Sequence, residues 1–124
     1  MEIHMKTVMV VDDSRAVRES LKFFLKEEGY SVLEGQNGQE GLEVLSENDA
    51  DLILTDVNMP VMDGLTMISE VRKTEKHKFT PILVLTTESQ QSVMEKGREL
   101  GATGWIVKPF NNEKVSKVLK KVLA

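Results

Sequence analysis

Short apolar runs recur along the chain without alternation of polar and apolar residues inside them, and segments of helical period separate the runs. Such runs are typical of strands in a parallel sheet covered by helices on both faces, because neither face of that sheet meets water. The pattern predicts five strands, at residues 7–11, 31–34, 52–55, 82–86 and 104–107.

Each predicted strand is followed by a segment whose apolar residues recur every three or four positions, as along one face of a helix. Val17, Leu21 and Leu25 after the first strand, and Val115 and Leu119 after the last, are clear examples. The residues expected to bound the helices have capping chemistry: Asn37 with Glu40 in a capping box, the Asp63-Gly64 turn, Ser89 and Asn111 as N-caps, and Gly29 and Gly101 as left-handed C-terminal caps. Five predicted helices therefore alternate with five predicted strands.

Strict alternation of strands and helices predicts an α/β fold in which right-handed crossovers place helices on both faces of a doubly wound parallel sheet. The pattern spans residues 6–124 without a linker, internal repeat or low-complexity tract, which indicates one domain. Residues 1–5 precede it, and His4-Met5 resembles a restriction-site scar, so we expect a vector-derived or disordered leader. In sheets of this class, ligands bind beyond the carboxyl ends of the strands.

The composition narrows the classes of function. Of 124 residues, 40% are hydrophobic and 29% charged, and the formal net charge of -4 provides no basic surface for nucleic acid. The chain has no cysteine, which excludes disulfides and thiolate metal sites, and its apolar runs are too short to cross a bilayer. We therefore expect a cytoplasmic protein that binds neither nucleic acid nor membranes. His4 and His77 are far apart and are expected to be surface or tail imidazoles.

Polar side chains follow four of the five predicted strands at the points where those strands end. They are Asp12 and Asp13, Asp56 with Asn58, Thr86 and Thr87, and Lys108 before Pro109. Because the carboxyl ends of parallel strands meet at one edge of the sheet, we expect these groups to converge. Two carboxylates held ~4 Å apart repel by about 4 kcal/mol at an effective dielectric of 20. Acidic and hydroxyl residues also cap helices, and Asp13 and Ser14 both suit that simpler role.

A hard divalent cation removes such repulsion, and ligands that are all oxygen favour Mg²⁺. Mg²⁺ typically takes one or two carboxylates together with a substrate phosphate. The Lys108 ammonium suits one phosphate oxygen and the Thr86 hydroxyl another. Asp56 leaves the central strand and is the expected nucleophile for an acyl phosphate, which needs no general base because a carboxylate is already ionised at pH 7.

These residues resemble the receiver domain of two-component response regulators, most closely the single-domain, CheY-like chemotaxis type. The resemblance covers residues 6–124 and rests on four motifs: VVDDS at 10–14, DVNMPVMDG at 56–64, LTTE at 85–88 and KPF at 108–110. It implies a flavodoxin-like, five-stranded sheet with strand order 2-1-3-4-5. It further implies that a histidine kinase phosphorylates Asp56, and that Mg²⁺, or Mn²⁺ in its place, is bound by Asp12, Asp13, Asp56 and the main-chain carbonyl of Asn58.

The same resemblance implies the roles of the remaining site residues. Lys108, Thr86 and Thr87 would stabilise the phosphoryl group, and the Lys108–Pro109 bond would be cis. On phosphorylation the Thr86 hydroxyl would move toward the phosphoryl group while the aromatic residue on the last strand, Trp105 here and tyrosine or phenylalanine in most relatives, turns inward. Asn58 and Glu88 match the pair that flanks the attacking water in chemotaxis regulators, which implies a short-lived phosphorylated state.

The expected function is a stand-alone response regulator with a histidine kinase as phosphodonor and no enzymatic activity beyond its own phosphorylation and dephosphorylation. Its fourth helix, fifth strand and fifth helix would bind a target such as a flagellar motor switch protein. One alternative is a phosphorelay intermediate that passes the group to a histidine phosphotransfer protein. Two others belong to different classes: a magnesium-dependent phosphatase of small molecules, and a pseudo-receiver that binds partners without phosphorylation.

Overall fold

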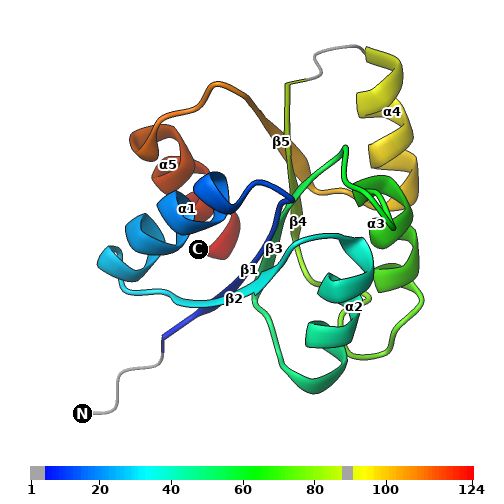
Figure 1. The fold of residues 1–124 in the computed structure, drawn as a ribbon, viewed down its shortest axis with the longest axis horizontal. Coiled ribbons are helices and arrows are strands. Elements are labelled where there is room, and N and C mark those ends of the chain that lie inside the picture. The colour runs from blue at the N-terminus through cyan, green and yellow to red at the C-terminus, as the bar shows by residue number, and fades with distance from the viewer. Residues whose placement is uncertain (1–4, 88–90) are drawn as a thin grey trace.

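Five strands and five helices alternate along residues 5–87 and 91–124, the part of the chain that the computed structural model describes (Figure 1). They are β1 (Thr7–Val11), α1 (Arg15–Glu27), β2 (Ser31–Gly35), α2 (Gly38–Glu47), β3 (Leu52–Asp56), α3 (Gly64–Arg72), β4 (Ile82–Thr86), α4 (Gln91–Leu100), β5 (Gly104–Val107) and α5 (Asn112–Leu123). The strands form one parallel sheet in the order β2-β1-β3-β4-β5. The predicted fold class and the strand order implied by the resemblance are both confirmed.

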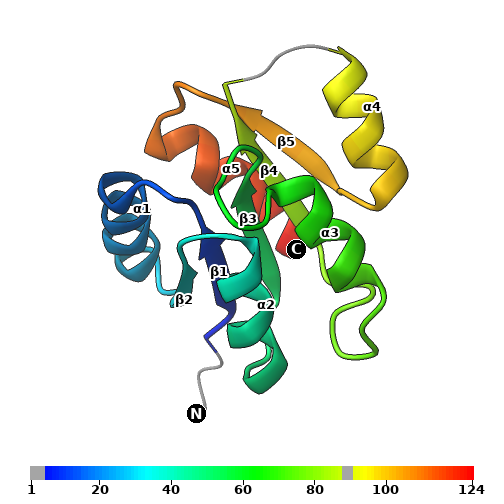
Figure 2. The same cartoon turned by 45° about the vertical axis from the view of Figure 1, so that its right-hand side comes forward.

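Helices cover both faces of the sheet, with α1 and α5 on one face and α2, α3 and α4 on the other (Figure 1 and Figure 2). Successive side chains of a strand point to opposite faces. Val10 of β1 therefore belongs to the same buried cluster as Leu21 of α1 and Leu119 of α5, whereas Met9 belongs with Met67 of α3. Because both faces are covered, the strands are apolar at nearly every position.

Side chains cap four of the helices at their N-termini. Ser14, Asn37, Asp63 and Asn111 each accept a hydrogen bond from the backbone N–H three residues further on, at 2.7–3.2 Å. The predicted capping box at Asn37 differs in one detail, because the Glu40 carboxylate accepts from the backbone N–H of Gln36. The predicted cap Ser89 lies outside the described residues. Gly29 and Gly101 have φ of +96° and +113°, as expected of left-handed C-terminal caps.

The segment between α3 and β4 corrects one prediction. His77 is buried, with 3% of its surface exposed, and its Nε2 accepts a hydrogen bond from the Ala50 N–H at 3.1 Å. The expectation of a surface imidazole was wrong for His77, and His4 lies outside the described residues. Arg72 holds this segment against the rest of the molecule, because its Nη1 donates hydrogen bonds to the carbonyls of His77 and Lys78. In the described part of the chain, no helix is long and apolar enough to span a membrane.

Candidate functional site

The acidic cluster lies where β1 and β3 end side by side. Val11 pairs with Thr55 in the parallel register, so the next residue of each strand, Asp12 and Asp56, reaches the same edge of the sheet. Asp13 follows at once, and one carboxylate oxygen from each of the three aspartates lies within 4.8 Å of the others. The predicted convergence of three carboxylates is therefore present, in the donor set that suits a hard divalent cation.

Asp12 is the buried member of this cluster, with 1% of its side chain exposed. Its Oδ1 accepts a hydrogen bond from the Ser14 N–H at 2.9 Å, and its Oδ2 accepts one from the Lys108 ammonium at 3.2 Å. The main-chain carbonyl of Asp12 is held as well, because Arg18 Nη1 donates to it at 2.8 Å. Asp13, in contrast, is exposed and does not cap α1, since Ser14 fills that role.

Asp56 ends β3 in a half-buried position with 14% of its side chain exposed. Its Oδ1 accepts a hydrogen bond from the Val57 N–H at 2.8 Å, and its Oδ2 lies 3.5 Å from the Lys108 Nζ. Burial raises the pKa of Asp56 above its ordinary value, and the Asp12 carboxylate raises it further, against the opposing effects of Lys108 and the Val57 hydrogen bond. One oxygen of Asp56 is thus oriented by the backbone while the other faces the lysine.

Lys108 reaches the cluster from the end of β5. Its backbone N–H donates to the Thr86 carbonyl at 2.7 Å, which fixes the start of the β5–α5 connection beside β4. From there its ammonium lies between the Oδ2 atoms of Asp12 and Asp56. The Lys108–Pro109 bond is cis, as the resemblance implies. One cation therefore balances part of the charge of three carboxylates.

The remaining predicted residues surround this centre at different depths. Thr86 ends β4 and is buried, whereas Thr87 and Asn58 are exposed. Trp105 of β5 is half-buried, and its ring packs against Gly97 of α4. Glu88 lies outside the described residues.

A loop connects Asp56 to α3 and folds back over the end of β3. The Gly64 N–H donates to the Val57 carbonyl at 2.8 Å, and a Cβ atom on Gly64 would overlap the carbonyl oxygen of Asp56. Glycine is therefore required where α3 begins. Within the same loop Val61 has φ of 69°, an unusual conformation for a β-branched residue.

Residues 8–120 match the family model described as the response regulator receiver domain. The chain belongs to this receiver-domain family. It is 40% identical over 116 residues to the sensor histidine kinase CheAY of Helicobacter pylori, an alignment that covers 92% of this chain and 14% of that protein. It is 37% identical over 116 residues to the transcriptional regulatory protein SrrA of Staphylococcus aureus, covering 94% and 47%. The receiver domain thus spans less than half the length of these two relatives.

A solved structure shares the fold over nearly the whole chain. The chemotaxis response regulator CheY4 of Vibrio cholerae is 43% identical, with a TM-score of 0.93, and the alignment covers 97% of this chain and 100% of that chain. This chain is therefore a receiver domain similar to CheY-like regulators.

The sequence did not predict that Arg18, Glu34 and Lys22 form a group of paired charges beside Asp12. Arg18 holds the Asp12 carbonyl, and its Nε lies 3.5 Å from the Glu34 carboxylate at the end of β2. Lys22, one turn further along α1, binds the other Glu34 oxygen at 2.9 Å. We expected no site group from β2, yet Glu34 stabilises the arginine. The spacing of Arg18 and Lys22, which places both on one face of α1, could have predicted a shared acidic partner.

Proposed function

We propose that the receiver domain is a phosphorylation switch in which the Asp56 carboxylate accepts a phosphoryl group from a phosphohistidine of a histidine kinase. The placement of Asp56 carries this proposal: it ends β3 beside Asp12 and Asp13, and the Lys108 Nζ lies 3.5 Å from its Oδ2. An oxygen of Asp56 attacks phosphorus, and the P–N bond breaks. The kinase imidazole leaves with the electron pair of that bond and takes a proton from solvent. Lys108 offsets the negative charge of the phosphoryl oxygens.

Mg²⁺ is the cofactor that the carboxylates fit, and Mn²⁺ can substitute for it. Asp12, Asp13 and Asp56 offer three carboxylate oxygens within 4.8 Å of one another, and the main-chain carbonyl of Asn58, two residues after the nucleophile, would supply a further hard ligand. When bound, the cation offsets the repulsion among the carboxylates and the charge of the phosphoryl oxygens. The chain itself positions Asp56 and keeps Lys108 within reach.

The switch runs from Asp56 to the face formed by α4, β5 and α5. β4 lies between β3 and β5 in the sheet, so Thr86 at the end of β4 stands between the strand of Asp56 and the strand of Trp105. Thr86 and Trp105 also line one small cavity, together with Val57, Leu65 and Gly97. The Thr86 hydroxyl and Thr87 contact the phosphoryl group, and Trp105 follows Thr86. A cytoplasmic target such as a flagellar motor switch protein binds the changed face.

The pair Asn58 and Glu88 favours this role over a phosphorelay intermediate, because a short-lived phosphorylated state suits a signal that must end quickly. The position of Asp56 on the third strand argues against a small-molecule phosphatase, whose nucleophile usually follows the first strand. The presence of Asp12, Asp13, Asp56 and Lys108 argues against a pseudo-receiver.

Intact-mass spectrometry after incubation with acetyl phosphate and Mg²⁺ tests the proposal. The wild-type chain should gain one phosphoryl group and lose it within minutes, and the Asp56→Asn variant should gain none. Asp51→Asn is a matched control, because Asp51 lies at the opposite end of β3, where it accepts a hydrogen bond from the Thr7 N–H at 2.7 Å. This control should behave like the wild type.

Each alternative predicts a different result. No mass gain in the wild type would support a pseudo-receiver, and steady turnover of sugar phosphates would support a phosphatase. A phosphorylated state that lasts for hours would support the phosphorelay intermediate and would contradict the inferred roles of Asn58 and Glu88.

A further inference from the structure

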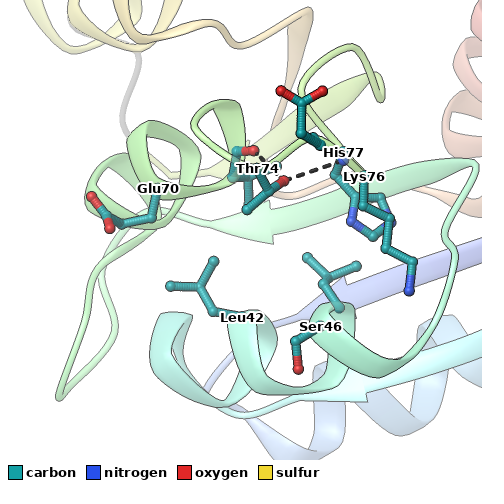
Figure 3. Close-up of a pocket in the computed structure, with 9 residues that line it drawn as sticks. Leu42, Ser46, Glu70, Thr74, Lys76 and His77 are labelled. Atoms are coloured by element: carbon teal, nitrogen blue, oxygen red, sulfur yellow. Dashed lines mark hydrogen bonds between the residues drawn. The ribbon is translucent and has the colours of Figure 1, made fainter.

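A cavity of about 480 Å³ opens between the carboxyl-terminal halves of α2 and α3 (Figure 3). This volume lies within the range of small-molecule sites, roughly 300–1,000 Å³. Leu42, Leu45 and Val71 give it an apolar wall, and the segment from Thr74 to His77 closes one end. Asp56 is remote from it, because the His77 ring contacts Ala50, two residues before β3 begins, while Asp56 ends that strand, about 20 Å away at ~3.3 Å per residue.

His77 brings a buried hydrogen-bond donor to this cavity. Its Nε2 accepts from the Ala50 N–H, so the neutral ring carries its proton on Nδ1. Burial, mainly, lowers the pKa of His77 and keeps the ring neutral. The Nδ1–H has no partner among the residues that the structure describes. Among the described residues, every fully buried side-chain nitrogen or oxygen has a hydrogen-bond partner. An unpartnered Nδ1 must therefore lie on the small surface that His77 exposes, and His77 lines the cavity.

The charged groups around the cavity differ in how firmly they are held. Glu70 and Glu75 are each engaged by a lysine three residues further on, at 2.8 and 3.0 Å. All three pairs are solvent-exposed, and the Lys76 Nζ lies 3.5 Å from Asp49, a longer separation than in the other two, so Lys76 is the least firmly held of these lysines. Figure 3 shows Lys76 beside His77, with Thr74 between them and Glu70, and with Leu42 and Ser46 of α2 on the opposite side. The end near His77 therefore offers two donors, one of them cationic.

We propose that this cavity binds a small carboxylic acid with an apolar aromatic or branched body. The apolar body packs against Leu42, Leu45 and Val71, and the carboxylate accepts a hydrogen bond from the His77 Nδ1–H and pairs with Lys76. A carboxylate fits better than a neutral acceptor, because charge-assisted hydrogen bonds are about twice as strong as neutral ones. The site is separate from the acidic cluster, and its occupancy does not depend on phosphorylation of Asp56.

Benzoate is a suitable probe, and benzyl alcohol is its neutral counterpart with the same ring. Each is titrated into the ¹⁵N-labelled full chain while the backbone amide signals are followed by NMR. Benzoate should produce saturable shifts at Ala50, Thr74 and His77, and benzyl alcohol should bind about tenfold more weakly, because it lacks the charge-assisted bonds.

Three variants separate the proposed contacts from unspecific binding. His77→Gln keeps an acceptor for the Ala50 N–H but removes the Nδ1 donor, and Lys76→Met removes the cation; each should weaken benzoate binding about tenfold. Lys120→Met is the matched control, because Lys120 is an exposed lysine of α5, on the other face of the sheet, and does not line the cavity; it should leave the affinity unchanged.

Three results would overturn the proposal, and the first two are absence of saturable shifts in the wild type and equal weakening by Lys120→Met and Lys76→Met. The comparison of these two surface variants decides the question even if His77→Gln does not fold. Saturable binding that is the same for benzoate and benzyl alcohol would also contradict it, since the carboxylate would then contribute nothing.

Discussion

Asp13 is the member of the acidic cluster that faces water. Because it is exposed, a substitution of Asp13 should change the affinity for the metal without lowering the stability of the metal-free protein. Since Ser14 caps α1, Asp13→Ala should leave the metal-free stability within about 0.5 kcal/mol of the wild type, or raise it slightly by removing like charge. The same variant should lose most of the rise in Tm that Mg²⁺ produces, which for the wild type corresponds to about 2.7 kcal/mol at one hundred times Kd. Thermal unfolding with and without Mg²⁺ measures both effects.

Ser14→Ala is the neighbouring control for this prediction. It removes the cap and should cost about 1 kcal/mol without metal, while the Mg²⁺-dependent rise in Tm remains. A metal-free loss in Asp13→Ala as large as that in Ser14→Ala would contradict the assignment of Asp13 to the metal site.

His77 makes the stability depend on pH in a defined direction. Burial, and then the nearby charge of Lys76, lower its pKa below the ordinary 6.5, against the opposite effect of Asp49. Below about pH 6.5 the unfolded chain binds a proton at His77 that the folded chain does not, so the free energy of unfolding falls as the pH falls, by at most about 1.4 kcal/mol per pH unit.

Urea denaturation at pH 7.5 and 5.5 tests this dependence. The loss of stability between the two pH values should be smaller in His77→Gln than in the wild type, since other titrating groups contribute equally to both. An identical loss in the two proteins would show that His77 titrates in the folded chain as it does in the unfolded one.

At the scale of elements, the contact between α4 and β5 depends on a matched pair of residues. A Cβ atom on Gly97 would lie 3.2 Å from Trp105 Cη2 and 3.5 Å from Leu65 Cδ2, so the missing side chain makes room for the indole. Gly97→Ala should therefore not gain the ~1 kcal/mol that alanine normally adds in a helix, and the displaced indole should shift its fluorescence to the red. Trp105 is the only tryptophan, so the signal is unambiguous.

Trp105→Tyr provides the control for this contact. The smaller ring should accommodate the alanine, so Gly97→Ala should be stabilising in the Trp105→Tyr background, with a coupling energy of about 0.5–3 kcal/mol in a double-mutant cycle of unfolding free energies. Additive effects of the two substitutions would mean that α4 and β5 do not depend on this fit.

At the scale of the whole molecule, alternation of apolar runs and helical segments predicted the fold because both faces of the sheet are covered. The ends of the strands predicted the acidic cluster for a related reason: parallel strands bring their carboxyl ends to one edge. Periodicity does not encode the order of the strands, which came from the resemblance. It also did not predict the burial of His77 or the support of Asp12 by Arg18 and Glu34, because these depend on contacts between segments distant in sequence.

Direct chemical mapping of the phosphorylated residue is the most direct test of the central claim. Borohydride converts an aspartyl phosphate to homoserine, and peptide mass spectrometry then locates the converted residue after treatment with acetyl phosphate and Mg²⁺. We predict conversion at position 56 only, abolished when Mg²⁺ is removed by a chelator. Conversion at position 12 or 13, or none at any aspartate, would contradict the account.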